Sequence, residues 1–174
     1  MRKIVLLRGV APKGKNRIPS MSALANMLEK LGFEDVKTYI QSGNIALTSE
    51  WSDGEICAKV HDSILDNIGA DLSVIVKDIK QLTTAIAENP FGKGYDASMC
   101  HLVFTNDLIS AQRLQKMLAT DFGEELFVVG NECLYLYLPE TAVKKRSYTN
   151  FIERQLGIRV TIRKLHTVLH LISL

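Results

Sequence analysis

The segment VKTYIQSGNIALT, from Val36 to Thr48, decides the fold. Two runs rich in β-branched and aromatic residues flank Ser42-Gly43-Asn44, which is a typical turn-forming tripeptide. Glycine and asparagine tolerate the positive φ that such a turn requires. The segment therefore predicts a β-hairpin with strands at 36–41 and 45–48.

The residues around the hairpin predict one further strand and one helix on each side of it. Short apolar runs at 4–7 and 72–77 are typical of buried strands. Apolar residues at helical spacing predict helices at 20–32 and 53–69, each capped by the polar residue at its start and closed by glycine. The predicted order is βαββαβ.

The second half of the chain repeats this order. A short helix from Asp78, which Asn89-Pro90 ends, and a turn-rich connector at 90–99 come first. The elements that follow are a strand at 101–105, a helix at 110–119, strands at 126–129 and 133–138, a helix at 147–156, a strand at 158–162, and a final apolar segment at 165–174 that suits a helix or an added strand.

We therefore predict an α+β protein of two tandem ferredoxin-like (βαββαβ, α/β-plait) units, with antiparallel sheets covered by helices on one face. The predicted units are 1–78 and 100–174, and a connecting helix and loop at 79–99 joins them. Right-handed crossovers make strands one and two of a unit parallel, with strand three between them. The loop at 9–16 and the hairpin tip at 41–44 are then expected at one edge of the first sheet.

The charges are segregated along the chain. The net charge is +2, yet residues 1–17 hold six basic residues and no acidic one. Residues 141–174 hold seven basic residues and one acidic residue, whereas residues 18–140 hold eight basic and eighteen acidic ones. Such asymmetry permits a local anion-binding surface, although proteins for extended nucleic acid are usually strongly basic overall. The strand order predicts a second basic patch, formed by Lys144, Lys145, Arg146, Arg163 and Lys164.

Composition and cysteine usage predict a soluble cytoplasmic protein. No apolar run approaches the roughly 18 residues that a membrane-spanning helix needs, and no signal peptide is indicated. Cys57, Cys100 and Cys133 lie far apart and form no CxxC pair, which suits a reducing compartment. They are typical of small buried hydrophobic residues.

The loop GVAPKGKN, from Gly9 to Asn16, nearly matches a phosphate-binding loop. Asn16 replaces the serine or threonine that would bind magnesium, and Ile18-Pro19 delays the next helix. A looser anion site is predicted instead, because glycine lets backbone amides approach a ligand while basic side chains supply charge. The alternative is a solvated basic loop.

Polar side chains of the hairpin tip are expected beside this loop, where they suit a sugar or a base edge. Turn chemistry is the alternative for them, and it accounts better for Gly43 than for Gln41. The predicted anion-binding set is Arg8, Gly9, Lys13, Gly14, Lys15, Asn16, Gln41, Ser42 and Asn44.

Tyr135 and Tyr137 alternate with leucines, so they are expected on the sheet face that the helices do not cover. Stacking of nucleic-acid bases is one use of that face. Burial against the first unit or a partner subunit, as an interface, is the favoured alternative. His166 and His170 lack a third ligand, and the carboxylates are dispersed, so we predict no metal, no cofactor and no specific catalytic group.

Five segments resemble the bacterial domain-of-unknown-function family 1697 (DUF1697): LLRGVAPKGKN (6–16), TYIQSGN (38–44), NPF (89–91), LYLYLP (134–139) and TIRKLHTV (161–168). The resemblance implies a duplicated α/β plait and no established activity. The chain departs from the family pattern at Ala11 and Lys13, where asparagine and glycine are usual. It also departs at Lys164 and Leu165, which replace asparagine and tryptophan.

Three functions follow from these observations. The leading one is a binding module whose basic edge in the first unit holds a phosphate-bearing small molecule or a nucleic-acid segment. The second is an enzyme that acts at the same edge on a phosphorylated or nucleotide substrate. The third is a structural or partner-binding protein that uses the open sheet face.

Overall fold

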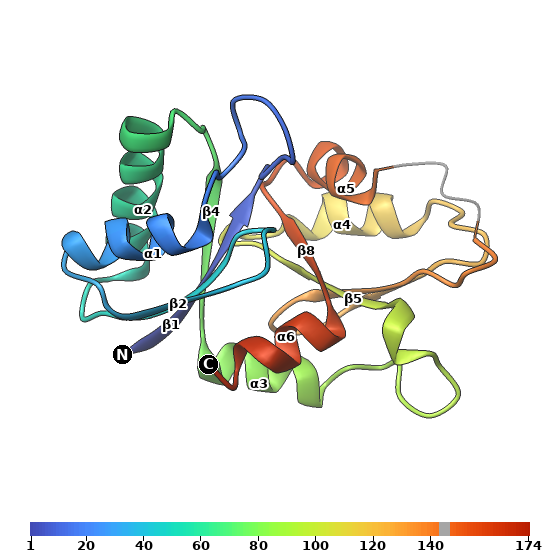
Figure 1. Ribbon diagram of the computed structural model, residues 1–174. Coiled ribbons are helices and arrows are strands. Elements are labelled where there is room, and N and C mark those ends of the chain that lie inside the picture. The colour runs from blue at the N-terminus through green and yellow to red at the C-terminus, as the bar shows by residue number, and fades with distance from the viewer. Residues whose placement is uncertain (143–146) are drawn as a thin grey trace. The chain divides into compact units, whose positions relative to one another are not determined.

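The predicted hairpin is present as strands β2 (Glu34–Tyr39) and β3 (Asn44–Thr48). The computed structural model, shown in Figure 1, describes residues 1–142 and 147–174. Within these residues the chain forms an α+β fold with two four-stranded antiparallel sheets and six α-helices. The strand order of both sheets is compatible with an α/β plait.

The sheet of the first unit is completed by β1 (Arg2–Arg8) and β4 (Ser73–Asp78). Its order is β2-β3-β1-β4, with every neighbouring pair antiparallel. β1 and β2 consequently run parallel to each other, with β3 between them, as the crossover rule predicts. This order sets which loops share an edge of the sheet.

Helices α1 (Met21–Lys30) and α2 (Asp53–Ile68) cover one face of this sheet (Figure 1). Val5 and Leu7 of β1 point toward the helices and are buried in one core with Leu28 and Ile56. Alternate residues of the strand thus pack against the apolar faces of both helices.

The starts of both helices are capped by serine. Ser20 accepts a hydrogen bond from the Ala23 amide at 3.1 Å, as the sequence predicts. The N-cap of α2 is Ser52 and not Asp53, because Ser52 and Glu55 bind each other's backbone amides in a capping box. The predicted N-cap, Asp53, was therefore one residue too far along the chain.

The second unit repeats the arrangement with β5 (Cys100–Phe104), β6 (Leu126–Val129), β7 (Leu134–Tyr137) and β8 (Thr161–Lys164), in the order β6-β7-β5-β8. Helices α4 (Ala111–Leu118) and α5 (Tyr148–Leu156) cover one face (Figure 1). Val103 and Leu134 of the sheet share a core with Met117 and Ile152 of these helices.

The last strand begins three residues later than predicted. The Arg159 amide donates to Asp107 Oδ2 at 3.0 Å, and the Val160 amide donates to Glu153 Oε1 at 3.1 Å. These two amides are therefore held by carboxylates and not by a neighbouring strand. The prediction of a strand from Ile158 was wrong for this reason, and β8 starts at Thr161.

The remaining elements are α3 (Ile79–Ala87), the 3-10 turn η1 (Ala97–Met99) and α6 (Leu165–Leu171). The final apolar segment thus forms a helix, which was one of its two predicted conformations. No helix in the described ranges is long and apolar enough to cross a membrane.

The chain divides into compact units at residues 1–80 with 171–174, and at residues 81–170. The predicted second unit extended to residue 174. The last four residues group with the first unit instead, where the Leu174 carbonyl accepts hydrogen bonds from Arg2 and Lys37, each at 3.0 Å.

Candidate functional site

The hairpin tip and the end of β1 lie side by side in the first unit. The Gly43 carbonyl accepts a hydrogen bond from the Leu7 amide at 2.8 Å. A Cβ atom on Gly43 would lie 2.7 Å from Leu7 Cβ and 2.9 Å from Val10 Cγ2. Glycine is therefore required here by close packing as well as by its φ of 80°. The tip and the loop after β1 share one edge, as the strand order predicts.

The loop between β1 and α1 is organised by its own backbone. The Ala11 amide donates to the Asn16 carbonyl at 2.9 Å, and the Arg17 amide donates to the Gly14 carbonyl at 3.3 Å. Gly9 and Gly14 both have positive φ. The Asn16 side chain accepts a hydrogen bond from the Asp71 amide at 3.2 Å, which ties the loop to the residues before β4. Asn16 therefore acts as a structural residue.

The polar side chains of the hairpin tip also bind the protein itself. Gln41 Nε2 donates to the Ile18 carbonyl at 2.6 Å. Asn44 is fully buried, and its Nδ2 donates to the Tyr39 carbonyl at 3.1 Å and to Ser42 Oγ at 2.9 Å. The Gln41 amide thus links the tip to the residues after the loop, whereas the Asn44 amide holds the hairpin tip together.

The basic side chains of the loop have a different environment. Lys13, Lys15 and Arg17 are exposed, and Arg8 is half-buried. Over residues 1–142 and 147–174, no carboxylate pairs with Lys13, Lys15 or Arg17. Three cations without an ion-pair partner among the described residues therefore lie within the five-residue segment 13–17. Arg17 belongs with Lys13 and Lys15, although it was not in the predicted set.

His61 is a titratable group that contacts Asp71, the residue whose amide binds the Asn16 side chain. Its Nδ1 lies 3.0 Å from Asp62 Oδ1 and its Nε2 lies 3.1 Å from Asp71 Oδ1. The hydrogen bond to Asp62, and next that to Asp71, raises the pKa of His61 above its ordinary value. Only the imidazolium can donate from both ring nitrogens, so both contacts are satisfied only when His61 is protonated.

We expect His61→Gln to lower the free energy of unfolding at about pH 5 and to have little effect at about pH 8.5. The folded-state pKa is raised, so the stabilisation is complete below the unfolded-state pKa and is lost as the pH rises through the folded-state value. The effect should stay below about 1 kcal/mol, because solvent screens a side chain that is 34% exposed. Urea unfolding at both pH values, followed by the fluorescence of the single tryptophan, measures it. An equal loss at both pH values would contradict this assignment.

Two of the five residues of the second predicted basic patch, Arg163 and Lys164, are among the described residues. Lys144, Lys145 and Arg146 lie outside the described residues. Arg163 is buried, and its Nη1 donates to Thr161 Oγ1 at 2.7 Å and to the Ile162 carbonyl at 3.0 Å. Burial lowers the pKa of Arg163 to about 10. Lys164 is exposed. Of the two described members, only Lys164 therefore presents its charge to solvent.

Tyr135 and Tyr137 lie on the sheet face opposite α4 and α5, as their alternation predicts. Tyr135 is 1% exposed, and its hydroxyl donates to the Ala85 carbonyl near the end of α3 at 2.7 Å. Burial raises the pKa of this hydroxyl. Tyr137 packs against Phe91 and Tyr95, with ring centroids 5.4 and 5.0 Å away. Both tyrosines thus have partners within the second unit, and Tyr135 has no ring face left for a base.

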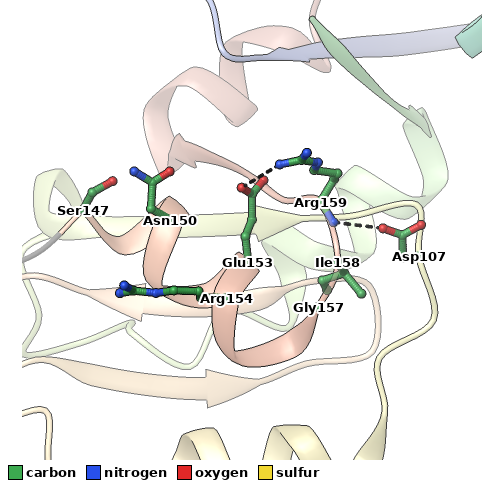
Figure 2. Close-up of a pocket in the computed structure, with 8 residues that line it drawn as sticks. All are labelled: Asp107, Ser147, Asn150, Glu153, Arg154, Gly157, Ile158 and Arg159. Atoms are coloured by element: carbon green, nitrogen blue, oxygen red, sulfur yellow. Dashed lines mark hydrogen bonds and ion pairs between the residues drawn. The ribbon is translucent and has the colours of Figure 1, made fainter.

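A cavity that the sequence did not indicate lies in the second unit (Figure 2). Its volume is about 820 Å³, and it is lined by Asp107, Ser147, Asn150, Glu153, Arg154, Gly157, Ile158 and Arg159. The lining comes from the loop after β5, from α5 and from the turn before β8. No motif joins Asp107 to the later residues, so only folding could show that they share a cavity.

The potential metal ligands and the cysteine thiols are the remaining candidate groups. Within the described segments, no three His, Cys, Asp or Glu side chains are grouped to hold a metal ion. Cys100 and Cys133 are buried, and Cys57 is partly buried, with no disulfide among them. Burial raises the pKa of Cys100, which disfavours the reactive thiolate.

Comparison with known proteins gives a family and a fold. No curated protein matches the chain. The solved structure of the conserved bacterial protein SP0830 from Streptococcus pneumoniae is similar, with a TM-score of 0.78 and 22% identity over 99% of this chain and 97% of that one. At this identity the likeness shows the fold alone. A family model described as a protein of unknown function, DUF1697, matches residues 1–135. The match covers most of the chain, including the motifs at 6–16, 38–44 and 89–91, so the chain belongs to the DUF1697 family.

Proposed function

We propose that the protein is a binding module for a phosphate-bearing ligand, which the loop from Arg8 to Arg17 in the first unit holds. The observation that carries this proposal is the group of three exposed cations, Lys13, Lys15 and Arg17, without a carboxylate partner in the described residues. Unpaired cations on a short segment repel one another, and a bound anion relieves that repulsion. We also propose that each unit is a ferredoxin-like plait, whose strand order places this loop beside the hairpin tip.

The backbone of the loop supports the same ligand class. In the described structure, the amides of Lys13, Gly14 and Lys15 make no hydrogen bond within the protein. Gly14 has a φ of 82°, and there is open space around the position of a Cβ atom there. Successive amides in such a turn can converge on one anion, and the absence of a side chain lets a phosphate approach.

The predicted ligand set divides by role. Asn16, Gln41, Ser42 and Asn44 support the loop and the tip through the hydrogen bonds described above. Lys13, Lys15 and Arg17 contact the ligand, together with Arg8 at the start of the loop and the loop amides. Lysine and arginine bind phosphate through charge-assisted hydrogen bonds.

The test uses the double variant Lys13→Gln/Lys15→Gln and the control Lys93→Gln/Lys116→Gln. The control removes the same charge from exposed positions of the second unit. Binding of inorganic pyrophosphate is measured by calorimetry. Binding of 5′-phosphorylated RNA, single-stranded DNA and duplex DNA is measured by fluorescence anisotropy over a range of salt concentrations.

We expect the loop variant to lose at least about tenfold in affinity and the control to keep wild-type affinity. If the ligand is nucleic acid, the logarithm of affinity should fall linearly with the logarithm of salt concentration, and the slope should decrease by about two in the loop variant. If pyrophosphate binds more tightly than every oligonucleotide, the ligand is a small molecule. Absence of binding, or equal affinities of the two double variants, would reject the proposal.

A further inference from the structure

The cavity of the second unit has a polar lining with a defined arrangement of charges. Six of its eight lining residues have polar or charged side chains, and Ile158 supplies the only apolar one. An opening of about 820 Å³ lies within the range of small-molecule sites. This lining suits a hydrated, hydrogen-bonding ligand better than a lipid or a bare aromatic ring.

The two carboxylates of the cavity are engaged by the protein. Asp107 accepts the Arg159 amide at 3.0 Å. Glu153 binds Arg159 Nη1 at 3.4 Å (Figure 2). It also accepts the Val160 amide at 3.1 Å, and its side chain is 10% exposed. The ion pair with Arg159 offsets the charge of Glu153, and the backbone amide contacts hold the turn before β8 against α5 and the loop after β5.

A stripe of donors also runs along α5, the helix that carries Glu153. Ser147, Asn150 and Arg154 follow one another at intervals of three and four residues, so they lie on one face of the helix. Ser147 is the N-cap residue, but its hydroxyl makes no capping hydrogen bond. Arg154 is exposed and has no ion pair with any residue of 1–142 or 147–174. Among the described residues, Arg154 is therefore the cation of the lining that no carboxylate pairs with.

We propose that this cavity is a second ligand site, which binds a small anion that also carries hydroxyl groups. Arg154 receives the phosphate or carboxylate group, because a guanidinium presents paired N–H donors that match two oxygens of such a group. Asn150 lies one turn and Ser147 two turns before it, and both bind the hydroxyl groups. The exposed carboxylate of Asp107 accepts further hydroxyl donors from the ligand.

This site does not depend on the loop of the first unit. Its lining residues all lie between 107 and 159, within the second unit. The double variant of Lys13 and Lys15 should therefore leave the site unchanged. If experiment rejects one of the two proposals, the other is not affected.

The experiment follows backbone amide NMR shifts of the full chain during titration with four probes. D-ribose 5-phosphate carries an anion and hydroxyl groups, D-gluconate replaces the phosphate by a carboxylate, D-ribose lacks the charge, and inorganic phosphate lacks the hydroxyl groups. The test variant is Arg154→Gln. Its control is Lys116→Gln, which removes one charge from an exposed position of α4 outside the cavity.

We expect D-ribose 5-phosphate or D-gluconate to cause saturable shifts at residues 147–159, with weaker binding of D-ribose and of inorganic phosphate. Arg154→Gln should raise the dissociation constant at least about tenfold, whereas Lys116→Gln should not change it. The better of the two anionic probes identifies the anionic group. Absence of saturable shifts at these residues, equal binding of D-ribose, or equal affinities of the two variants would overturn the proposal.

Discussion

Replacing Gly43 by alanine should destabilise the first unit by about 3 kcal/mol. Two costs add at this position. The φ of 80° disfavours any residue with a Cβ atom, which costs about 1–2 kcal/mol. The new methyl group would also lie 2.7 Å from Leu7 Cβ, an atom fixed by the β1 backbone, so the hairpin tip must move away from the strand. That movement would stretch the hydrogen bond from the Leu7 amide to the Gly43 carbonyl.

Gly14→Ala is the matched control for this prediction. Gly14 has nearly the same φ, 82°, but nothing lies within 4 Å of its Cβ position. It should therefore lose only the conformational part, about 1–2 kcal/mol. Denaturant unfolding followed by the fluorescence of Trp51, which packs on Phe33 in the first unit, reports on this unit. If the two variants were equally destabilised, close packing at Gly43 would not be the cause.

Replacing Glu153 by alanine should destabilise the second unit by about 2–3 kcal/mol. The carboxylate is nearly buried and accepts the Val160 amide at 3.1 Å. Val160 is 1% exposed, so removal of the acceptor leaves a buried donor without a partner. The contact with Arg159 adds less, because that side chain is 69% exposed.

Amide hydrogen exchange measures this prediction at the residue concerned. Exchange of the Val160 amide should accelerate in Glu153→Ala, together with exchange in α5 and β8. Asp107→Ala is the control, since Asp107 also accepts a backbone amide but is exposed at the surface. Water can replace it there, so the loss should be below about 1 kcal/mol. Similar losses in both variants would mean that burial of Glu153 does not decide its contribution.

These variants also separate support from ligand contact in the two sites. Gly43 positions the hairpin tip, and Glu153 positions the turn before β8, yet neither is proposed to carry the ligand's anionic group. Lys13 and Arg154 are exposed, without ion pairs in the described part of the chain, and their replacement should change binding with little change in stability. Measurement of stability and affinity for each variant tests this division directly.

Local signals in the sequence predicted most of the secondary structure. The turn at Ser42-Gly43-Asn44, the cap at Ser20 and the apolar run at 4–7 act over a few residues, so their effects do not depend on distant neighbours. The order of these elements, with right-handed crossovers, then predicted that the loop after β1 and the hairpin tip share an edge. For this reason the sequence could also indicate the basic loop as a candidate site.

The uses of individual polar groups were decided only by the tertiary structure. Ile158, Arg159 and Val160 are typical of a strand, but carboxylates from Asp107 and Glu153 take the backbone amides of the last two. Gln41 and Tyr135 likewise donate to carbonyls that are distant in sequence, those of Ile18 and Ala85. A buried donor binds whichever acceptor the fold brings within about 3 Å, and local sequence does not specify that acceptor. The cavity at α5 could not be predicted from local sequence either, because its lining comes from segments that only folding brings together.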